Sequence, residues 1–172
     1  MDLDSAISLI RTPLLIGSLP ARWADLGAGS GLFTKALADL LCTGSEIYAV
    51  DKKPASVLSD FPQNIRLNLL ALDFVREELP FNGLDGILMA NSFHYVKEKL
   101  TFIRKLKQAL KKTGMLIVVE YDTNIPVGNW VPYPVDFLNL KTLLSKAGFE
   151  SVEKLGEYPS VYGRKMYSAA IR

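Results

Sequence analysis

Short apolar runs alternate with helical segments along most of this chain. Five runs have the length of strands, and they cover residues 22–26, 46–50, 65–70, 86–90 and 115–121. In 86–90 and 115–119 the apolar residues do not alternate with polar ones, which is typical of strands that helices cover on both faces. The alternation therefore predicts an α/β fold, a Rossmann-like three-layer sandwich around a mostly parallel sheet.

Apolar residues at helical spacing predict the layers that cover this sheet. Amphipathic stripes lie at about 32–41, 100–110 and 135–147, and a glycine follows each of them as a signal for a helix end. The next segments, 149–154 and 165–171, have no convincing helix between them. They predict an antiparallel C-terminal hairpin at the edge of a seven-stranded sheet.

The size and composition of the chain fit one domain. Its 172 residues, 49% of them hydrophobic, fill a core without metals or disulfides. We expect a single domain over 1–172, in which 1–20 form an N-terminal cap segment with a short helix that ends before Pro13. The net charge of +2 gives no sign of nucleic-acid binding. The N-terminus fits neither a signal peptide nor a membrane span, so we expect a cytoplasmic protein without a membrane partner.

Three alternately spaced glycines, Gly27, Gly29 and Gly31, join the first predicted strand to the first predicted helix. Glycines at such a junction let the backbone touch a ligand. Leu32 stands where a dinucleotide-binding G-x-G-x-x-G motif needs its third glycine, and no Gly-Lys-Ser/Thr of a P-loop follows. Asp25, which precedes Gly27 by two positions, is a poor neighbour for pyrophosphate but suits an ammonium group. The loop predicts a ligand that carries a positive charge.

Asp51 ends the second predicted strand, 20 positions after Gly31. Ligands of parallel sheets bind beyond the carboxyl ends of the strands, where a carboxylate can accept hydrogen bonds from ribose hydroxyls. The position therefore indicates a ligand that contains a nucleoside. An alternative is that Asp51 caps a helix that begins near Pro54.

From about Trp23 to Tyr121 the chain resembles the class I S-adenosylmethionine-dependent methyltransferases, in particular the small, type-11 or ubiquinone-biosynthesis-like branch. Asp25-Leu26-Gly27-Ala28-Gly29-Ser30-Gly31 looks like the first motif of that family. The resemblance implies that Asp25, Gly27, Ala28, Gly29 and Gly31 hold the methionine end of S-adenosyl-L-methionine. It also implies that Asp51, with Lys52 beside it, binds the ribose.

Two further segments carry the resemblance. Leu72-Asp73-Phe74 looks like the adenine motif, which implies that Asp73 accepts from the exocyclic amine and that the main chain at Phe74 addresses the ring. The segment Ala90–Tyr95 resembles the fourth motif, which implies that Asn91 and Ser92 lie near the transferred methyl. As alternatives, Asp73 serves as a turn or cap residue and Asn91 as a turn former at a strand end.

The resemblance implies in-line attack on a sulfonium methyl. Because the leaving group is a neutral thioether, no general acid is needed. A base matters only if the methyl acceptor starts protonated. His94 is the first candidate, because imidazole exchanges a proton near neutral pH, while Tyr95, Glu120 and Asp122 are weaker candidates. His94 is the only histidine, which excludes a metal cluster built on histidines, and no metal is expected. A structural or solvent-facing role for His94 stays open.

Little of the chain is left for recognising the acceptor. The loop 123–134 offers Trp130 and Tyr133, which with Tyr95 either form a substrate-binding wall or, in the case of Trp130 and Tyr133, pack the loop onto the domain. The fourth motif is not the Asp/Asn-Pro-Pro-Tyr/Phe type used for nucleobase and glutamine amino groups. A small-molecule acceptor is therefore expected, with a protein partner or an oligomer as open alternatives.

Two other functions compete with the methyltransferase reading. A nicotinamide-dependent oxidoreductase would keep Asp51, but the chain lacks the glycine spacing and the room for a second substrate domain. A methyltransferase-like protein that binds a cofactor or a partner without catalysis would keep the whole glycine loop. Binding of S-adenosylmethionine against NADH separates the first alternative from a methyltransferase, and turnover separates the second.

Overall fold

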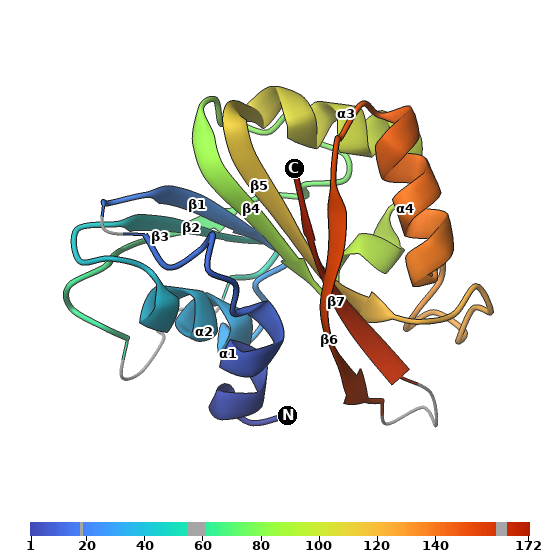
Figure 1. The fold of residues 1–172 in the computed structure, drawn as a ribbon, viewed down its shortest axis with the longest axis horizontal. Coiled ribbons are helices and arrows are strands. Elements are labelled where there is room, and N and C mark those ends of the chain that lie inside the picture. Colours follow the sequence, from blue (N-terminus) through green and yellow to red (C-terminus); the bar gives the residue numbers. More distant parts are fainter. Residues whose placement is uncertain (18, 55–60, 161–164) are drawn as a thin grey trace.

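The computed structural model describes residues 1–17, 19–54, 61–160 and 165–172. Its centre is a seven-stranded sheet in the order β3-β2-β1-β4-β5-β7-β6, in which β5, β7 and β6 pair antiparallel and all other neighbours pair in parallel (Figure 1). The mostly parallel sheet with an antiparallel C-terminal edge is thus confirmed. The strands are β1 (Arg22–Leu26), β2 (Glu46–Asp51), β3 (Arg66–Ala71), β4 (Leu84–Ala90), β5 (Leu110–Tyr121), β6 (Val152–Pro159) and β7 (Lys165–Ile171).

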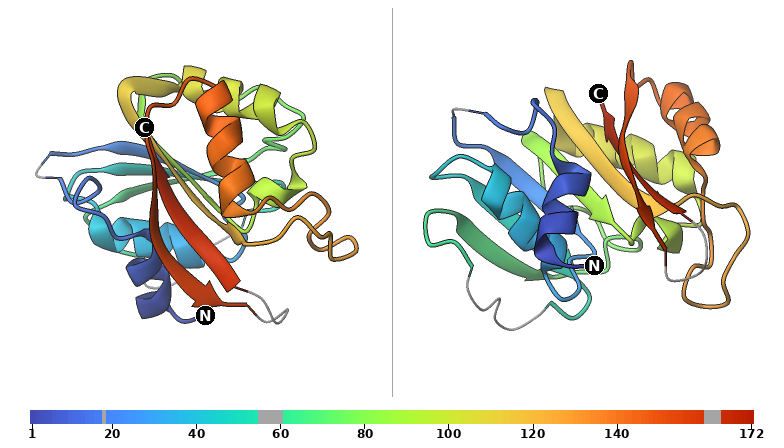
Figure 2. Two further views of the ribbon diagram at one scale, coloured as in Figure 1. Left: turned by 45° about the vertical axis from the view of Figure 1, so that its right-hand side comes forward. Right: turned by 60° about the horizontal axis from the view of Figure 1, so that its bottom comes forward.

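Helices cover both faces of this sheet (Figure 2). Buried side chains form one core with α1 and α2 on the first face and a second core with α3 and α4 on the other. Successive residues of β4 alternate between these cores, since Ile87 packs in the second and Leu88 in the first. This explains why the central strands are apolar throughout. The helices are α1 (Leu3–Ile10), α2 (Leu32–Leu40), the 3-10 helix η1 (Phe93–Tyr95), α3 (Lys99–Ala109) and α4 (Phe137–Lys146).

The strand boundaries differ most from the sequence prediction at the starts of β5 and β6. β5 begins at Leu110, inside the segment predicted as helix, because Leu110 pairs with Leu84 before the register shifts. A Cβ at Gly114 would lie only 3.0 Å from the backbone oxygens of Leu84 and Lys111, so this glycine belongs to the strand rather than to a helix end. β6 begins at Val152 instead of 149, since the chain first passes through the turn that follows α4.

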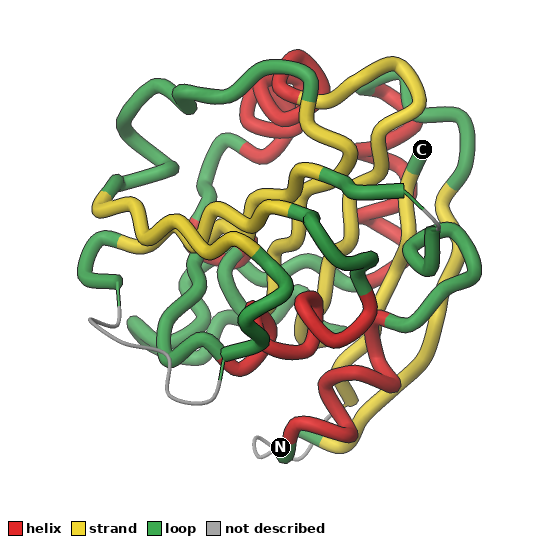
Figure 3. Tube along the Cα trace, turned by 90° about the vertical axis from the view of Figure 1, so that its left-hand side faces the viewer, coloured by secondary structure: helices red, strands yellow, loops and turns green. Residues whose placement is uncertain are grey.

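The N-terminal helix α1 lies on the face of the sheet that α2 also covers (Figure 3). The helix α1 packs on α2 and also contacts β6, where the side chain of Leu9 approaches Gly156. Asp2 caps this helix by accepting from the backbone N–H of Ser5 at 2.9 Å. The segment therefore completes the first core.

Among the described residues, no helix combines the length and the apolar character that spanning a lipid bilayer requires.

The packing of Trp23 on Gly86 gives a test of this core. The two residues are neighbours on β1 and β4, and a Cβ at Gly86 would overlap the buried indole ring. We expect Gly86→Ala to lower the free energy of unfolding by about 1–3 kcal/mol, because overpacking forces the ring from its site. Urea denaturation measures this, with Gly17→Ala as the control, since its Cβ would meet no atom nearer than 3.9 Å. Equal stability of the two variants would contradict the packing.

Candidate functional site

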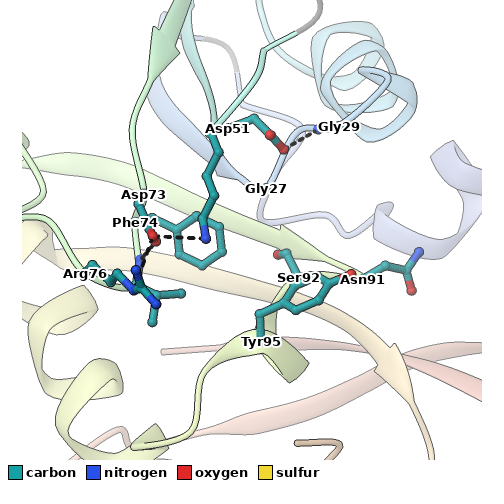
Figure 4. A pocket seen from close by; sticks show the side chains of 11 residues that line it. Gly27, Gly29, Asp51, Asp73, Phe74, Arg76, Asn91, Ser92 and Tyr95 are labelled. Carbon is teal, nitrogen blue, oxygen red and sulfur yellow. Dashed lines mark hydrogen bonds and ion pairs between the residues drawn. The ribbon is translucent and has the colours of Figure 1, made fainter. Parts of the chain in front are cut away.

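A cavity of about 570 Å³ opens at the carboxyl ends of β1, β2 and β4 (Figure 4). The chain goes from β1 to β2 on one side and later adds β4 on the other, so the cavity lies at the point where the strand order reverses. Open parallel sheets bind ligands at this point. The lining residues are Gly27, Gly29, Asp51, Lys52, Asp73, Phe74, Val75, Arg76, Asn91, Ser92 and Tyr95.

The turn between β1 and α2 forms one wall of the cavity through its backbone. Gly27, Gly29 and Gly31 have φ angles of +89°, +53° and +83°, a region that favours glycine. A Cβ on Gly27 would collide with the Cβ of Ser92, whose hydroxyl donates to the Leu26 carbonyl at 2.5 Å. The wall therefore has no room for a side chain at Gly27, and a ligand there meets the main chain.

Asp25 lies beneath this turn and not among the residues that line the cavity. Its side chain is buried, and one carboxylate oxygen accepts from the Thr34 hydroxyl of α2 at 2.6 Å. Burial raises the pKa of Asp25 to about 7; the Thr34 hydrogen bond opposes this shift and the charge of Asp51 adds to it. Asp25 thus fastens the start of α2 to the end of β1. The sequence analysis missed Thr34, because nothing in the sequence except its place in the predicted helix indicates its hydrogen bond to Asp25.

Asp51 ends β2 on the opposite side of the glycine turn. One carboxylate oxygen accepts from the Gly29 N–H and the other from the Lys53 N–H, each at 3.0 Å. These backbone donors orient the carboxylate at the cavity wall, and each oxygen has a further lone pair for a ligand. The alternative role, as cap of a helix near Pro54, involves residues 55–60, which lie outside the described chain.

Asp73 and its neighbours form the far wall. Asp73 pairs with Lys52 at 3.0 Å and with Arg76 at 3.8 Å, and it also accepts from the Val75 N–H at 3.1 Å. Partial burial alone would raise the pKa of Asp73, but the Lys52 ammonium and the backbone donors outweigh it and hold the pKa below its usual value. Asp73 is therefore a turn residue and a cavity residue at once. Phe74, nearly buried, packs its ring against Phe102.

The sequence analysis missed Arg76 and Val75 in this wall. Both follow the Leu72-Asp73-Phe74 segment directly. An exposed arginine is common on any protein surface, so its residue type alone does not indicate a site. Only the position of Arg76 directly after that segment could have indicated that it lines the cavity.

Asn91 and Ser92 form the wall at the end of β4. Asn91 has a φ of +53°, unusual for a residue other than glycine but tolerated by asparagine. Its Oδ1 atom is buried and has no hydrogen-bond partner within the described parts of the chain. A buried acceptor without a donor is costly unless a ligand supplies one.

His94 is buried behind this wall, with 2% of its surface exposed. Its Nδ1 lies 3.0 and 2.9 Å from the two carboxylate oxygens of Glu120, which is itself fully buried. The second ring nitrogen, Nε2, is buried without a hydrogen-bond partner among the residues described. The solvent-facing alternative for His94 is therefore wrong. Asp122, another candidate base, instead accepts from the Phe137 N–H at the start of α4 at 3.0 Å.

Tyr95 lines the cavity, whereas Trp130 and Tyr133 do not belong to its lining. The Trp130 side chain is 73% exposed, so it does not pack the loop onto the domain. The backbone of the loop is joined to η1, because the Tyr133 N–H donates to the His94 carbonyl at 3.0 Å.

Lys99 joins this loop to η1. Its ammonium donates to the carbonyls of Tyr133 at 2.6 Å, Val96 at 2.7 Å and Phe93 at 3.4 Å. Burial lowers the pKa of Lys99 to about 8, against the opposing charge of Glu120. Lys99 thus differs from a solvated surface lysine, because its ammonium bonds to three carbonyls.

The buried carboxyl of Asp25 predicts a pH dependence of stability. Between its unfolded pKa near 3.8 and its folded pKa of about 7, Asp25 is ionised in the unfolded chain and protonated in the folded one. The folded state then binds more protons, so stability falls as the pH rises through this window and levels off above it. We expect Asp25→Asn to remove this fall in the free energy of unfolding, which is on the order of a few kcal/mol in the wild type. Urea denaturation at a series of pH values measures it.

Asp39→Asn is the matched control, because Asp39 is exposed on α2. A wild-type profile that parallels that of Asp25→Asn would contradict the raised pKa of Asp25.

The comparisons with known proteins agree with this geometry. A family model described as a methyltransferase domain matches residues 24–116, more than half of the chain. A search of curated proteins finds no match. Many solved structures match, and all those compared below share less than 25% identity with this chain, which supports the fold alone.

Three solved structures show the shared fold. The 1,6-didemethyltoxoflavin-N1-methyltransferase of Burkholderia thailandensis, crystallised with 1,6-didemethyltoxoflavin and S-adenosylhomocysteine, is 18% identical with a TM-score of 0.75, over 99% of this chain and 77% of that one. A SAM-dependent methyltransferase of Leishmania major is 18% identical with a TM-score of 0.72, over 99% and 72%. A SAM-dependent methyltransferase of Aquifex aeolicus is 19% identical with a TM-score of 0.62, over 99% and 98%.

Other solved structures that match are longer than this chain. The match spans 46% of the citrinin polyketide synthase CMeT domain and 55% of a putative O-methyltransferase of Nostoc punctiforme. The predicted family and fold are confirmed: the chain belongs to the methyltransferase domain family and has the Rossmann-like fold of class I S-adenosylmethionine-dependent methyltransferases.

Proposed function

We propose that this chain binds S-adenosyl-L-methionine in the cavity and transfers its methyl group to a small-molecule acceptor. The observation that carries the proposal is the contact of Asp51 with the Gly29 N–H, which places a strand-end carboxylate beside the glycine turn. A nucleoside that carries a cationic amino-acid end needs this combination of a ribose acceptor and an open backbone.

The residues present fit this cofactor. Gly27 and Gly29 present only backbone atoms to the cavity, and the buried Oδ1 of Asn91 has no hydrogen-bond partner among the described residues. The volume of about 570 Å³ lies in the range of small-molecule sites. When bound, S-adenosylmethionine supplies an electrophilic sulfonium methyl whose leaving group is a neutral thioether.

The proposed contacts follow from the places of the residues. The backbone of Gly27, Ala28, Gly29 and Gly31 would hold the methionine end, and Asp25 would support that turn from beneath through Thr34. Asp51 would bind the ribose hydroxyls, next to Lys52. Asp73 and Phe74 would hold the adenine, while Asn91 and Ser92 would lie at the transferred methyl.

The role of the chain in the reaction is alignment and exclusion of water. Holding the reactants in a near-attack arrangement contributes about 7–11 kcal/mol to a reaction of this kind. Tyr95 lies at the cavity, and the proposal keeps Trp130 and Tyr133 as acceptor contacts from the adjoining loop. It also keeps a cytoplasmic location and, as an alternative function, cofactor or partner binding without catalysis.

Calorimetric titration of the purified protein with S-adenosylmethionine and S-adenosylhomocysteine tests this proposal, with NADH as the control ligand. We expect saturable binding of both sulfur nucleosides and none of NADH. Asp51→Ala is expected to weaken binding by about 1.5–3 kcal/mol, because it removes charged acceptors of the ribose hydroxyls.

Two further variants sharpen this test. Asp51→Asn keeps one acceptor oxygen and should lie between wild type and Asp51→Ala, whereas the exposed Asp39→Ala should bind like wild type. NADH binding in place of the sulfur nucleosides would overturn the proposal. Unchanged affinity in Asp51→Ala would overturn the ribose assignment.

A further inference from the structure

Four large apolar or aromatic side chains stay exposed on η1 and on the loop 123–134, namely Tyr95, Ile125, Trp130 and Tyr133. We call them the apolar rim. We propose that the methyl acceptor is an uncharged molecule with an apolar ring system, and that this ring system lies on the apolar rim while the attacking atom reaches the cavity. The inference rests on the proposed function, because it names the substrate class of the same site.

Tyr95 marks the side from which an acceptor reaches the cavity. Most of the lining residues are proposed cofactor contacts, and two of the others directly follow Asp73 at the proposed adenine end. Tyr95 instead lies beside Ser92: its N–H donates to the Ser92 carbonyl at 3.2 Å, and its ring lies near Ser92 and Asn91 in Figure 4. An acceptor that meets the transferred methyl at Asn91 and Ser92 therefore lies next to Tyr95.

The loop 123–134 continues this surface beyond Tyr95. Because β5 and β4 run in parallel, the loop leaves the sheet at the edge where β4 ends. The Tyr133 N–H donates to the His94 carbonyl at 3.0 Å, and the Lys99 ammonium donates to the Tyr133 carbonyl at 2.6 Å. The backbone at Tyr133 is thus fixed beside η1, and the loop lies next to η1 in both ribbon views (Figure 1, Figure 2).

The exposed side chains of the loop stand on an ordered backbone. The Asn124 amide donates to the Asp136 carboxylate, and the Asp136 N–H donates back to Asn124 Oδ1 at 3.1 Å, so the two ends of the loop are joined. Between them Val127 and Val131 form an antiparallel bridge, and the Trp130 N–H donates to the Val127 carbonyl at 3.2 Å. Aromatic side chains have few torsions, so on such a backbone they lose little conformational freedom when a ligand covers them.

The charge pattern of the loop indicates what kind of molecule fits the apolar rim. Residues 123–135 include no charged side chain. The carboxylates on either side are engaged, since Asp122 accepts from the Phe137 N–H at 3.0 Å and Asp136 from the Asn139 N–H at 2.8 Å. A phosphate or carboxylate on the acceptor would lose hydration here without gaining a counter-charge. An uncharged ring system gains free energy by leaving water and stacks on the aromatic side chains.

The same pattern disfavours a membrane surface or a nucleic acid as the occupant of the apolar rim. Both carry phosphates, and both are bound through lysine and arginine side chains. The loop has neither residue type, and the ammonium of Lys99, which contacts the loop, donates to backbone carbonyls. A second copy of the chain would also cover an apolar surface, and dependence on protein concentration distinguishes it from an acceptor.

The indole N–H signals in nitrogen-15 spectra test the proposal, because the chain has two tryptophans. Trp130 lies on the apolar rim, whereas Trp23 is buried in the first core and serves as the internal control. Trp130→Phe assigns the two signals. With 2-naphthol as the probe we expect a saturable shift of the Trp130 signal and no shift of the Trp23 signal. With 2-naphthyl phosphate we expect binding at least about ten-fold weaker, because the charge must leave water.

Three outcomes of this titration would overturn the proposal. They are tighter binding of the phosphate than of 2-naphthol, a Trp130 signal that neither probe shifts, and a Trp130 shift that follows protein concentration instead of the probe. The last would show that a second copy of the chain covers the apolar rim.

Tyr133→Ala and Leu69→Ala form a matched pair of variants. The two side chains are 42% and 39% exposed, but Leu69 lies on β3 at the far edge of the sheet. We expect Tyr133→Ala to weaken 2-naphthol binding about three- to ten-fold, because an aromatic contact is lost, and Leu69→Ala to bind like wild type. Equal affinities in the two folded variants would contradict the proposed place of the acceptor.

Calorimetric titration with S-adenosylhomocysteine separates this inference from the proposed function. We expect the same affinity with and without 2-naphthol, because the two ligands lie side by side. Competition between them would overturn the inference, since the probe would then occupy the cofactor site. A protein that binds S-adenosylhomocysteine but not 2-naphthol keeps the proposed function and loses this inference, whereas failure to bind S-adenosylhomocysteine overturns the proposed function itself.

Discussion

The close approach of Gly27 to Ser92 determines the shape of the site. The turns after β1 and β4 meet where no side chain fits, and the Ser92 hydroxyl fastens them by donating to the Leu26 carbonyl. Asn91 takes a left-handed conformation at the end of β4. Since these turns close one side, the cavity opens toward β2, where Asp51 meets the Gly29 N–H. The strand order and Gly27 therefore determine where the cavity lies.

Carboxyl groups lie in two parts of the site and have different surroundings there. On the cofactor side, Asp51 accepts from two backbone N–H groups, and Lys52 helps to hold the pKa of Asp73 below its usual value. Asp25 beneath the turn has one hydroxyl partner and a raised pKa. On the other side, Glu120 at the end of β5 is satisfied by backbone N–H groups and by His94. The His94–Glu120 pair and the proposed cofactor contacts thus depend on different strands.

The sequence predicted the strands and helices well where pattern and packing coincide. The apolar runs of β4 and β5 predicted burial on both faces, and the glycine spacing predicted the turn after β1. Interactions between distant segments could not be predicted. That Glu120 would orient His94, or that Lys99 would bond to the loop at Tyr133, depends on the register of β5 and on the course of a loop, which local pattern does not encode. The start of β5 at Leu110 was missed for the same reason, because it depends on pairing with Leu84, which is distant in the sequence.

A crystal structure of the protein with S-adenosylhomocysteine tests the central claim most directly. The account predicts that the ribose hydroxyls lie within hydrogen-bond distance of Asp51, with the amino-acid end against the Gly27 turn and the sulfur near Asn91. Little movement of the glycine turn is expected, since Ser92 and Asp51 already hold it. A ligand bound elsewhere on the molecule, or one bound here with its ribose away from Asp51, would contradict the account.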